Sequence, residues 1–270
     1  MATGVGLAGV AVAGFLVWRA YRDTSTEVAV DAVVDEFRAA TTDVPATTAP
    51  ATSAPVETTH PAAPPRRLPS AGVYVYATTG GESVDALAGT DHDYPAETTI
   101  TVLRAGCGVV LRWVALEERT EEWDLCLGGG GDLFGTYYES YHRFFGRDDR
   151  RRYECGESTL LPAGVAGGDS WGRTCDGGDR TEVVRVEVVG VEPLAVGGEA
   201  VDSVHLRVAT DLSATDGTTS SSQGELWLHP QTGLPLRQID RTATTSPQVI
   251  GDVHYAEQYE LVLTSLEPRL

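Results

Sequence analysis

From Gly72 to the C-terminus, hydrophobic and polar residues alternate with a period of two over much of the chain. Such alternation predicts strands that bury one face against a core. The alternating runs are rich in Val, Thr, Tyr and Trp, and Gly, Asp and Pro separate them. Because the connections are short, we expect a mainly β domain of antiparallel strands. The predicted strands are residues 72–78, 98–104, 109–115, 118–126, 183–191, 203–212, 224–229, 234–239 and 254–263.

A different pattern, an apolar run without any charge, occupies residues 2–18 and ends at Arg19. At about 1.5 Å per residue, a helix over this run would span roughly 26 Å, close to the ~30 Å hydrocarbon core of a bilayer. We therefore predict an N-terminal transmembrane helix at residues 1–22, with a cleaved secretory signal as the alternative. Arg19 and Arg22 follow the run and by themselves favour a cytoplasmic C-terminal part. The cysteines and the linker described below favour an extracytoplasmic one, so we expect a single-pass protein of the cell membrane.

Two further segments follow the predicted anchor, one with helical spacing of apolar residues and one of low complexity. Val30, Val33, Val34 and Phe37 recur at helical spacing. They predict a juxtamembrane amphipathic helix within residues 23–40, packed on its own anchor or domain or on a partner helix. Residues 41–70 are rich in Ala, Thr and Pro, which predicts a disordered linker that acts as a stalk. Residues 71–270 are the predicted β-domain.

The charge of the chain excludes one class of function. The formal net charge is −19, and the sequence contains neither Lys nor Asn. A domain this acidic repels nucleic acid, so we expect no nucleic-acid partner. Basic charge supplied by Arg alone, in a composition heavy in Ala, Val, Thr and Gly, is typical of GC-rich bacteria.

The four cysteines predict two disulfides. They lie 19, 29 and 20 residues apart, at Cys107, Cys126, Cys155 and Cys175. None of these spacings is C-x-x-C, which argues against a zinc or redox motif. Structural disulfides in an oxidising compartment fit better, and four free buried thiols are the alternative. We favour sequential pairing, because a hairpin around Leu116-Glu117 can bring Cys107 opposite Cys126, with Val110 opposite Trp123.

Candidate catalytic and metal-binding residues are few. Gly168-Asp169-Ser170-Trp171-Gly172 matches the G-x-S-x-G pattern of a nucleophile elbow. That elbow requires a strand that feeds a helix, and no helix is predicted here, so a Gly-rich turn explains the segment better. The six histidines are scattered without metal-ligand spacing. We therefore predict a non-catalytic protein without a metal or cofactor, and a serine hydrolase is the weakest alternative.

The densest aromatic segment, residues 137–145, precedes an Arg-rich stretch at residues 146–152. One interpretation is an aromatic platform beside a basic loop that binds a sugar or an anionic head group. The other is a strand buried on both faces whose hairpin turn carries solvated Arg–Asp pairs. The candidate ligand-binding residues of the first interpretation are Tyr137, Tyr141, Arg150, Arg151 and Arg152.

Several short motifs run through almost the whole β-domain: Gly72-Val73-Tyr74-Val75-Tyr76, Tyr94-Pro95 with Thr98-Thr99-Ile100-Thr101, Cys107 with Arg112-Trp113, and Phe144-Phe145-Gly146 leading to Tyr153-x-Cys155. In this layout the chain resembles uncharacterised, membrane-anchored actinobacterial proteins. That family has no assigned activity, so the resemblance implies the layout alone.

A second set of motifs lies within residues 182–263: Gly190-Val191-Glu192, Val196-Gly197-Gly198, Val204-His205-Leu206, Glu225-Leu226-Trp227-Leu228-His229-Pro230 and Thr232-Gly233-Leu234-Pro235-Leu236-Arg237. This part resembles bacterial half-barrel envelope proteins of the lipoprotein-carrier type. The resemblance implies a curved antiparallel sheet, half-barrel-like, around a groove that holds acyl chains.

Together these features predict a membrane-tethered, extracytoplasmic binding or sensor module of the bacterial cell envelope. Its expected partners are the membrane, through the N-terminal helix, and a lipid or glycan ligand. A structural or assembly subunit that binds another envelope protein is the alternative.

Overall fold

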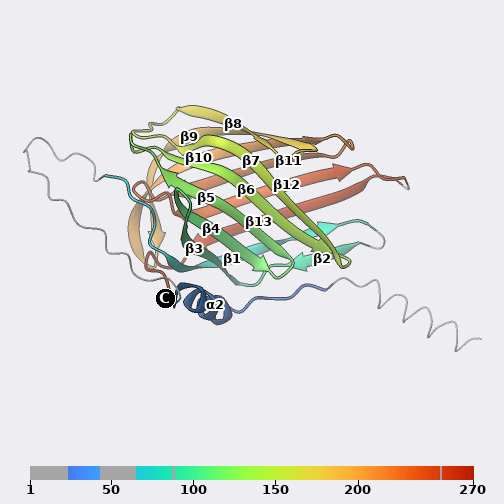
Figure 1. Ribbon diagram of the computed structural model, residues 1–270, viewed down its shortest axis with the longest axis horizontal. Helices are drawn as coiled ribbons and strands as arrows, with labels where there is room; N and C mark the ends of the chain where they lie inside the picture. The colour runs from blue at the N-terminus through green and yellow to red at the C-terminus, as the bar shows by residue number, and fades with distance from the viewer. Residues whose placement is uncertain (1–23, 43–64, 87–88, 250) are drawn as a thin grey trace, which may run out of the picture.

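The computed structural model describes residues 24–42, 65–86, 89–249 and 251–270 (Figure 1). One helix, α2 (Val30–Thr42), precedes a long series of strands. The strands are β1 (Gly72–Val84), β2 (Thr90–Asp93), β3 (Glu97–Ala105), β4 (Gly108–Leu116), β5 (Arg119–Leu127), β6 (Leu133–Phe144), β7 (Arg147–Leu161), β8 (Ser170–Asp176), β9 (Arg180–Val196), β10 (Glu199–Ala214), β11 (Thr219–Leu228), β12 (Pro235–Ser246) and β13 (Val253–Leu263).

The strands form an antiparallel meander that closes on itself. From β3 to β13 each strand pairs with the next one in the sequence. β1 pairs with β3 on one side and with β13 on the other, so twelve strands form a closed barrel and β2 pairs with the far end of β1. The prediction of an antiparallel sheet is confirmed, but the predicted half-barrel is wrong. Closure satisfies the backbone groups that an open half-barrel would leave exposed along two edges.

The hydrophobic core fills one end of the barrel, where inward-facing residues of many strands meet. Trp113 and Tyr76 are the largest aromatic side chains buried there, and the Tyr76 hydroxyl donates a hydrogen bond to the carbonyl oxygen of Pro235 at 2.8 Å. Tyr259 packs 4.6 Å from Trp113, centroid to centroid. The aliphatic side chains of this end are fully buried: Ile100, Leu111, Leu116, Leu133, Leu161, Leu206, Leu236, Leu261 and Leu263.

α2 covers part of the outer surface of the barrel. Its residues Val33, Val34 and Phe37 are buried against Val73 of β1 and Leu103 of β3. The amphipathic helix therefore packs on its own domain. This was one of the predicted arrangements, and packing on a partner helix was the other. It begins at Val30 and extends to Thr42, a few residues later than predicted.

Residues 65–70, which the sequence assigned to the disordered linker, belong to the barrel. Arg66 donates hydrogen bonds to the carbonyl oxygens of Pro230, Gly131 and Leu161 at 3.0, 3.1 and 2.7 Å. These carbonyls lie at the turns that end three different strand pairs, and Leu68 packs against the core. A guanidinium has five N–H donors, so one Arg side chain can join three loops. The composition of residues 41–70 gives no sign of these long-range contacts.

The structure pairs Cys107 with Cys126 and Cys155 with Cys175, the connectivity that the sequence favoured. The predicted register of the β4–β5 hairpin is wrong by one residue, because Gly108 rather than Cys107 lies opposite Cys126 and Leu111 rather than Val110 lies opposite Trp123. The observed register places Leu111 and Trp123 on the same inner face, whereas a one-residue slip would turn one of them to solvent.

No helix within the described residues has the length and apolar character needed to cross a membrane. The predicted anchor at residues 1–22 lies outside the described residues, as do residues 43–64 of the predicted linker.

Candidate functional site

A cavity of about 1870 Å³ occupies the barrel interior. At the core end it is lined by leucines from β5, β6, β7, β10 and β11: Leu125, Leu133, Leu161, Leu206 and Leu228. At the opposite end it reaches the turns that join β6 to β7, β10 to β11 and β12 to β13, where Gly146, Asp148 and Asp252 are exposed. The strap formed by residues 65–70 covers the leucine end, so the cavity is apolar at its covered end and polar at its open one.

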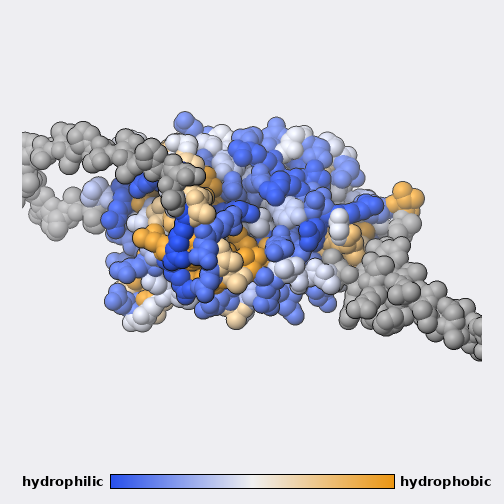
Figure 2. All heavy atoms as spheres, turned by 60° about the horizontal axis from the view of Figure 1, so that its bottom comes forward, coloured by the Kyte–Doolittle hydropathy of each residue, from blue (hydrophilic) through white to orange (hydrophobic). Residues whose placement is uncertain are grey.

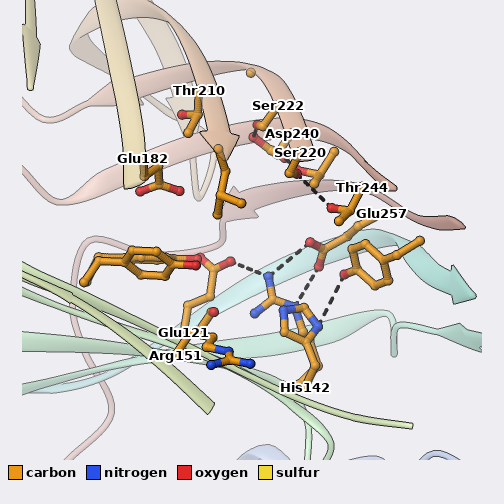
Figure 3. Close-up of a pocket in the computed structure, with 18 of the residues that line it drawn as sticks. Glu121, His142, Arg151, Glu182, Thr210, Ser220, Ser222, Asp240, Thr244 and Glu257 are labelled. Carbon is orange, nitrogen blue, oxygen red and sulfur yellow. Dashed lines mark hydrogen bonds and ion pairs between the residues drawn. The ribbon is translucent and has the colours of Figure 1, made fainter. Parts of the chain in front are cut away.

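Four carboxylates project into the polar part of the cavity from four strands: Glu121 of β5, Glu182 of β9, Asp240 of β12 and Glu257 of β13. Figure 3 shows them arranged around one shared space. Each occupies an inward position of its strand, where the period-two alternation would otherwise place an apolar side chain. Buried carboxylates are costly without a partner, so their partners determine what the site can do.

Glu257 and Glu121 share one buried cation. The Nε atom of Arg119 donates to Oε1 of Glu257 at 2.8 Å, and its Nη2 atom donates to Oε2 of Glu257 at 3.1 Å and also contacts Glu121. Tyr94 donates its hydroxyl to Glu257. Arg119 thus carries one positive charge against two carboxylates, which leaves one negative charge uncompensated in this network.

Glu182 and Asp240 lack a comparable cation. Glu182 accepts no hydrogen bond from any described residue, and burial raises its pKa to about 7, an effect that Arg173 partly opposes. Burial also raises the pKa of Asp240, to about 6, although Ser222 and Thr242 donate hydrogen bonds to it at 2.7 and 2.8 Å. Both groups are therefore poorly compensated when charged, and a positive group placed between them would stabilise their ionised forms.

Arg173 of β8 also faces the cavity and is incompletely paired. Its Nε atom is inaccessible to solvent and makes no hydrogen bond. Arg173 and Glu182 project from neighbouring strands and influence each other electrostatically, but these two side chains form no ion pair. Burial lowers the pKa of the Arg173 guanidinium. Because Arg173 lines the cavity, an anionic group of a molecule bound there would lie beside its positive charge.

A second polar network lies nearer the open end of the cavity, around Glu82 of β1. The Nδ1 atoms of His92 and His142 lie 3.0 and 3.1 Å from its two carboxylate oxygens, and Tyr255 donates its hydroxyl at 3.0 Å. Burial alone would raise the pKa of Glu82, but the hydrogen bonds from His142 and His92 outweigh it and hold the pKa at about 2. His92 stacks on Phe144 with ring centroids 4.6 Å apart, so this network also fixes the end of β6.

The five residues predicted to bind ligand do not form one site. Tyr137 and Arg151 line the cavity, where Arg151 pairs with Asp149 at 2.6 Å. Tyr141, Arg150 and Arg152 do not line it; Arg150 stacks over the ring of Tyr141, and Arg152 over that of Tyr137. The predicted basic loop is a continuation of strand β7, so its side chains alternate between the two faces of the sheet.

Ser170, the candidate nucleophile, begins strand β8 and is exposed. No helix follows it, so the strand-to-helix geometry of a nucleophile elbow is not formed there. Within the described residues, one group of side chains has metal-ligand proximity, namely Cys107, Asp124 and Cys126. Both cysteines are joined in a disulfide and offer no thiolate to a metal.

Sequence reasoning missed the cavity carboxylates. The signal that could have found Glu121 is its position two residues before Trp123 in an alternating strand, which places both on the same face. Glu182 immediately precedes the predicted strand at residues 183–191, and Asp240 follows the one at residues 234–239. The observed β9 and β12 extend beyond these apolar residues, and both carboxylates lie within them.

No protein-family model matches this chain, and no curated protein does. Among solved structures, the hypothetical lipoprotein YmcC from Escherichia coli is similar, with 10% sequence identity, a TM-score of 0.32, and coverage of 70% of this chain and 87% of that one. A protein described as a "putative lipoprotein" from Parabacteroides distasonis is similar at 11% identity, a TM-score of 0.30, and 74% and 98% coverage.

Proposed function

We propose that this chain is a non-catalytic binding protein that holds an amphiphilic ligand inside its barrel. The observation that carries the proposal is the cavity of about 1870 Å³, apolar at its covered end and polar at its open end. Small-molecule sites usually have volumes of roughly 300–1,000 Å³, so this one has room for a ligand the size of a lipid.

The position of the apolar surface supports a ligand inside the barrel over a protein partner outside it. On the face of the molecule that carries α2, apolar residues occur in small groups separated by hydrophilic ones (Figure 2). Large protein interfaces expose broader apolar patches than this. The leucines of the cavity, by contrast, come from several strands and line one shared space.

We also propose an extracytoplasmic location in the cell envelope, with a single N-terminal membrane anchor. The two disulfides support an oxidising compartment, where such bonds form and persist. The uncharged run at residues 2–18 supports the anchor. A tethered binding protein in this location would have direct access to membrane-derived amphiphiles.

A cavity-filling substitution tests the binding role. Val208 of β10 lines the cavity, and Arg207 beside it points outward and pairs with Glu187 at 3.1 Å. We expect the full-length chain to bind the neutral apolar fluorophore N-phenyl-1-naphthylamine with an increase in its emission. Val208→Trp places an indole in the cavity and should reduce that increase, while the matched control Arg207→Trp should retain it. If folded Val208→Trp, verified by circular dichroism, binds the fluorophore as well as the original chain does, the cavity is not the binding site.

A further inference from the structure

We propose that the polar head of the ligand is zwitterionic, with a cationic amine held by Glu121, Glu182 and Asp240 and an anionic oxygen bound by Arg173. This inference rests on the proposed binding function and adds the chemical class of the ligand. The three carboxylates are called the acidic cluster below. They come from β5, β9 and β12 and face the same part of the cavity (Figure 3).

The charges inside the barrel favour a cation in the acidic cluster. Arg119 is shared between Glu121 and Glu257, so it balances only one of them. No described cationic side chain forms an ion pair with Glu182 or Asp240. Buried carboxylates require paired charges, and the space between these strands is cavity rather than protein. A bound amine would supply the missing positive charge.

Arg173 supplies an independent reason to place an anionic oxygen in the same head group. It lines the cavity, and its guanidinium forms no ion pair with a described carboxylate. A buried charge without a partner costs free energy. Direct pairing with Glu182 would compensate it, but the two side chains form no ion pair although they project from adjacent strands. An ammonium group beside Glu182 and a phosphate or carboxylate group beside Arg173 would compensate both charges.

The order of chemical groups along the cavity completes the argument. The acidic cluster and Arg173 lie between the leucine end and the exposed turns of the mouth. A ligand whose head group lies at this level can extend its hydrocarbon part towards Leu206 and Leu228. An amphiphile with a phosphocholine-like or phosphoethanolamine-like head has this sequence of groups.

Isothermal titration calorimetry with a set of dodecyl amphiphiles tests the proposal, each used below its critical micelle concentration in detergent-free buffer. The probes are dodecylphosphocholine, dodecyltrimethylammonium, dodecyl phosphate and dodecyl maltoside, together with free phosphocholine, which lacks the chain. We expect dodecylphosphocholine to bind the full-length chain at least about tenfold more tightly than each other probe. Its phosphate can accept a hydrogen bond from a charged donor, worth ~1.5–3 kcal/mol, and its quaternary ammonium is attracted to the carboxylates by charge.

Variants separate the two halves of the head group. Glu182→Gln with Asp240→Asn removes carboxylate charge that attracts the quaternary ammonium. It should weaken binding of dodecylphosphocholine and dodecyltrimethylammonium about tenfold without weakening that of dodecyl phosphate. Arg173→Gln should weaken dodecylphosphocholine and dodecyl phosphate and leave dodecyltrimethylammonium unchanged. Outward-facing Glu187→Gln and Arg185→Gln, from β9, are the matched controls and should change nothing.

The outcomes distinguish this inference from the binding function on which it rests. If dodecyl maltoside binds as tightly as dodecylphosphocholine, the proposal of a zwitterionic head group is overturned, and the proposed amphiphile-binding function is retained. If free phosphocholine binds as tightly as dodecylphosphocholine, the proposed zwitterionic group is supported, but the proposal that the ligand is an amphiphile is overturned. If none of the probes binds, both proposals are overturned.

Discussion

Replacing Glu182 with glutamine should remove much of the pH dependence of folding. Burial raises the pKa of this carboxyl from an ordinary value of 4.5 to about 7. The folded chain therefore binds the proton more tightly than the unfolded chain does. The associated stability is fully present below pH 4.5 and is lost as the pH rises through 7. Glutamine has nearly the same shape and no charge, so the variant should keep the stability that the protonated carboxyl has.

The size of the effect follows from the shift in pKa. The difference between 7 and 4.5 is about 2.5 pKa units, and each unit corresponds to ~1.36 kcal/mol, so ionising Glu182 in the folded chain costs about 3 kcal/mol. Asp240, whose pKa is raised from 3.8 to about 6, acts in the same direction at slightly lower pH. His229, whose pKa is lowered by burial, acts in the opposite direction, but it is present in both proteins and cancels in the comparison.

Urea unfolding followed by tryptophan fluorescence at pH 5, 6, 7 and 8 provides the measurement. At pH 5 the original chain and Glu182→Gln should have similar free energies of unfolding, and at pH 8 the variant should be more stable by about 3 kcal/mol. Glu187→Gln, on the outer face of the same strand, is the matched control for removal of a glutamate charge. Parallel curves for the original chain and Glu182→Gln would refute the reasoning, because they would mean that Glu182 ionises in the folded barrel without cost.

Three further substitutions probe the structural framework. Replacing Cys155 and Cys175 with serine opens a link across 20 residues and should lower the free energy of unfolding by about 3 kcal/mol in urea titrations; a loss below 1 kcal/mol would contradict this. Arg119→Met leaves Glu257 buried without its cation and should cost about 3–5 kcal/mol in the same assay at pH 7; an unchanged free energy of unfolding would contradict this. Phe37→Ala removes the largest buried side chain of α2 and should cost about 3 kcal/mol, whereas an unchanged midpoint would mean that α2 does not dock on the barrel in solution.

Alternation of side chains made the strands predictable wherever one face is apolar and the other is polar. Residues 98–104 and 109–115 lie within the observed β3 and β4 for this reason. The method failed for β7 and β8, where both faces carry polar or charged residues and the inner face lines a cavity. Arg151 and Arg173 point inward on these strands, so a hydrophobic pattern had nothing to detect.

The disulfide connectivity that the sequence favoured is confirmed, although the hairpin register on which that preference rested is wrong by one residue. Closure of the barrel was decided only in three dimensions. It depends on the pairing of β1 with β13, and these strands are far apart in the sequence and show no mutual signal in a single chain. The acidic cluster depends on the same closure, because Glu121 and Asp240 face one cavity only after the first and last strands have met. Local pattern specifies which face of a strand is inward, but the long-range register specifies which inward residues become neighbours.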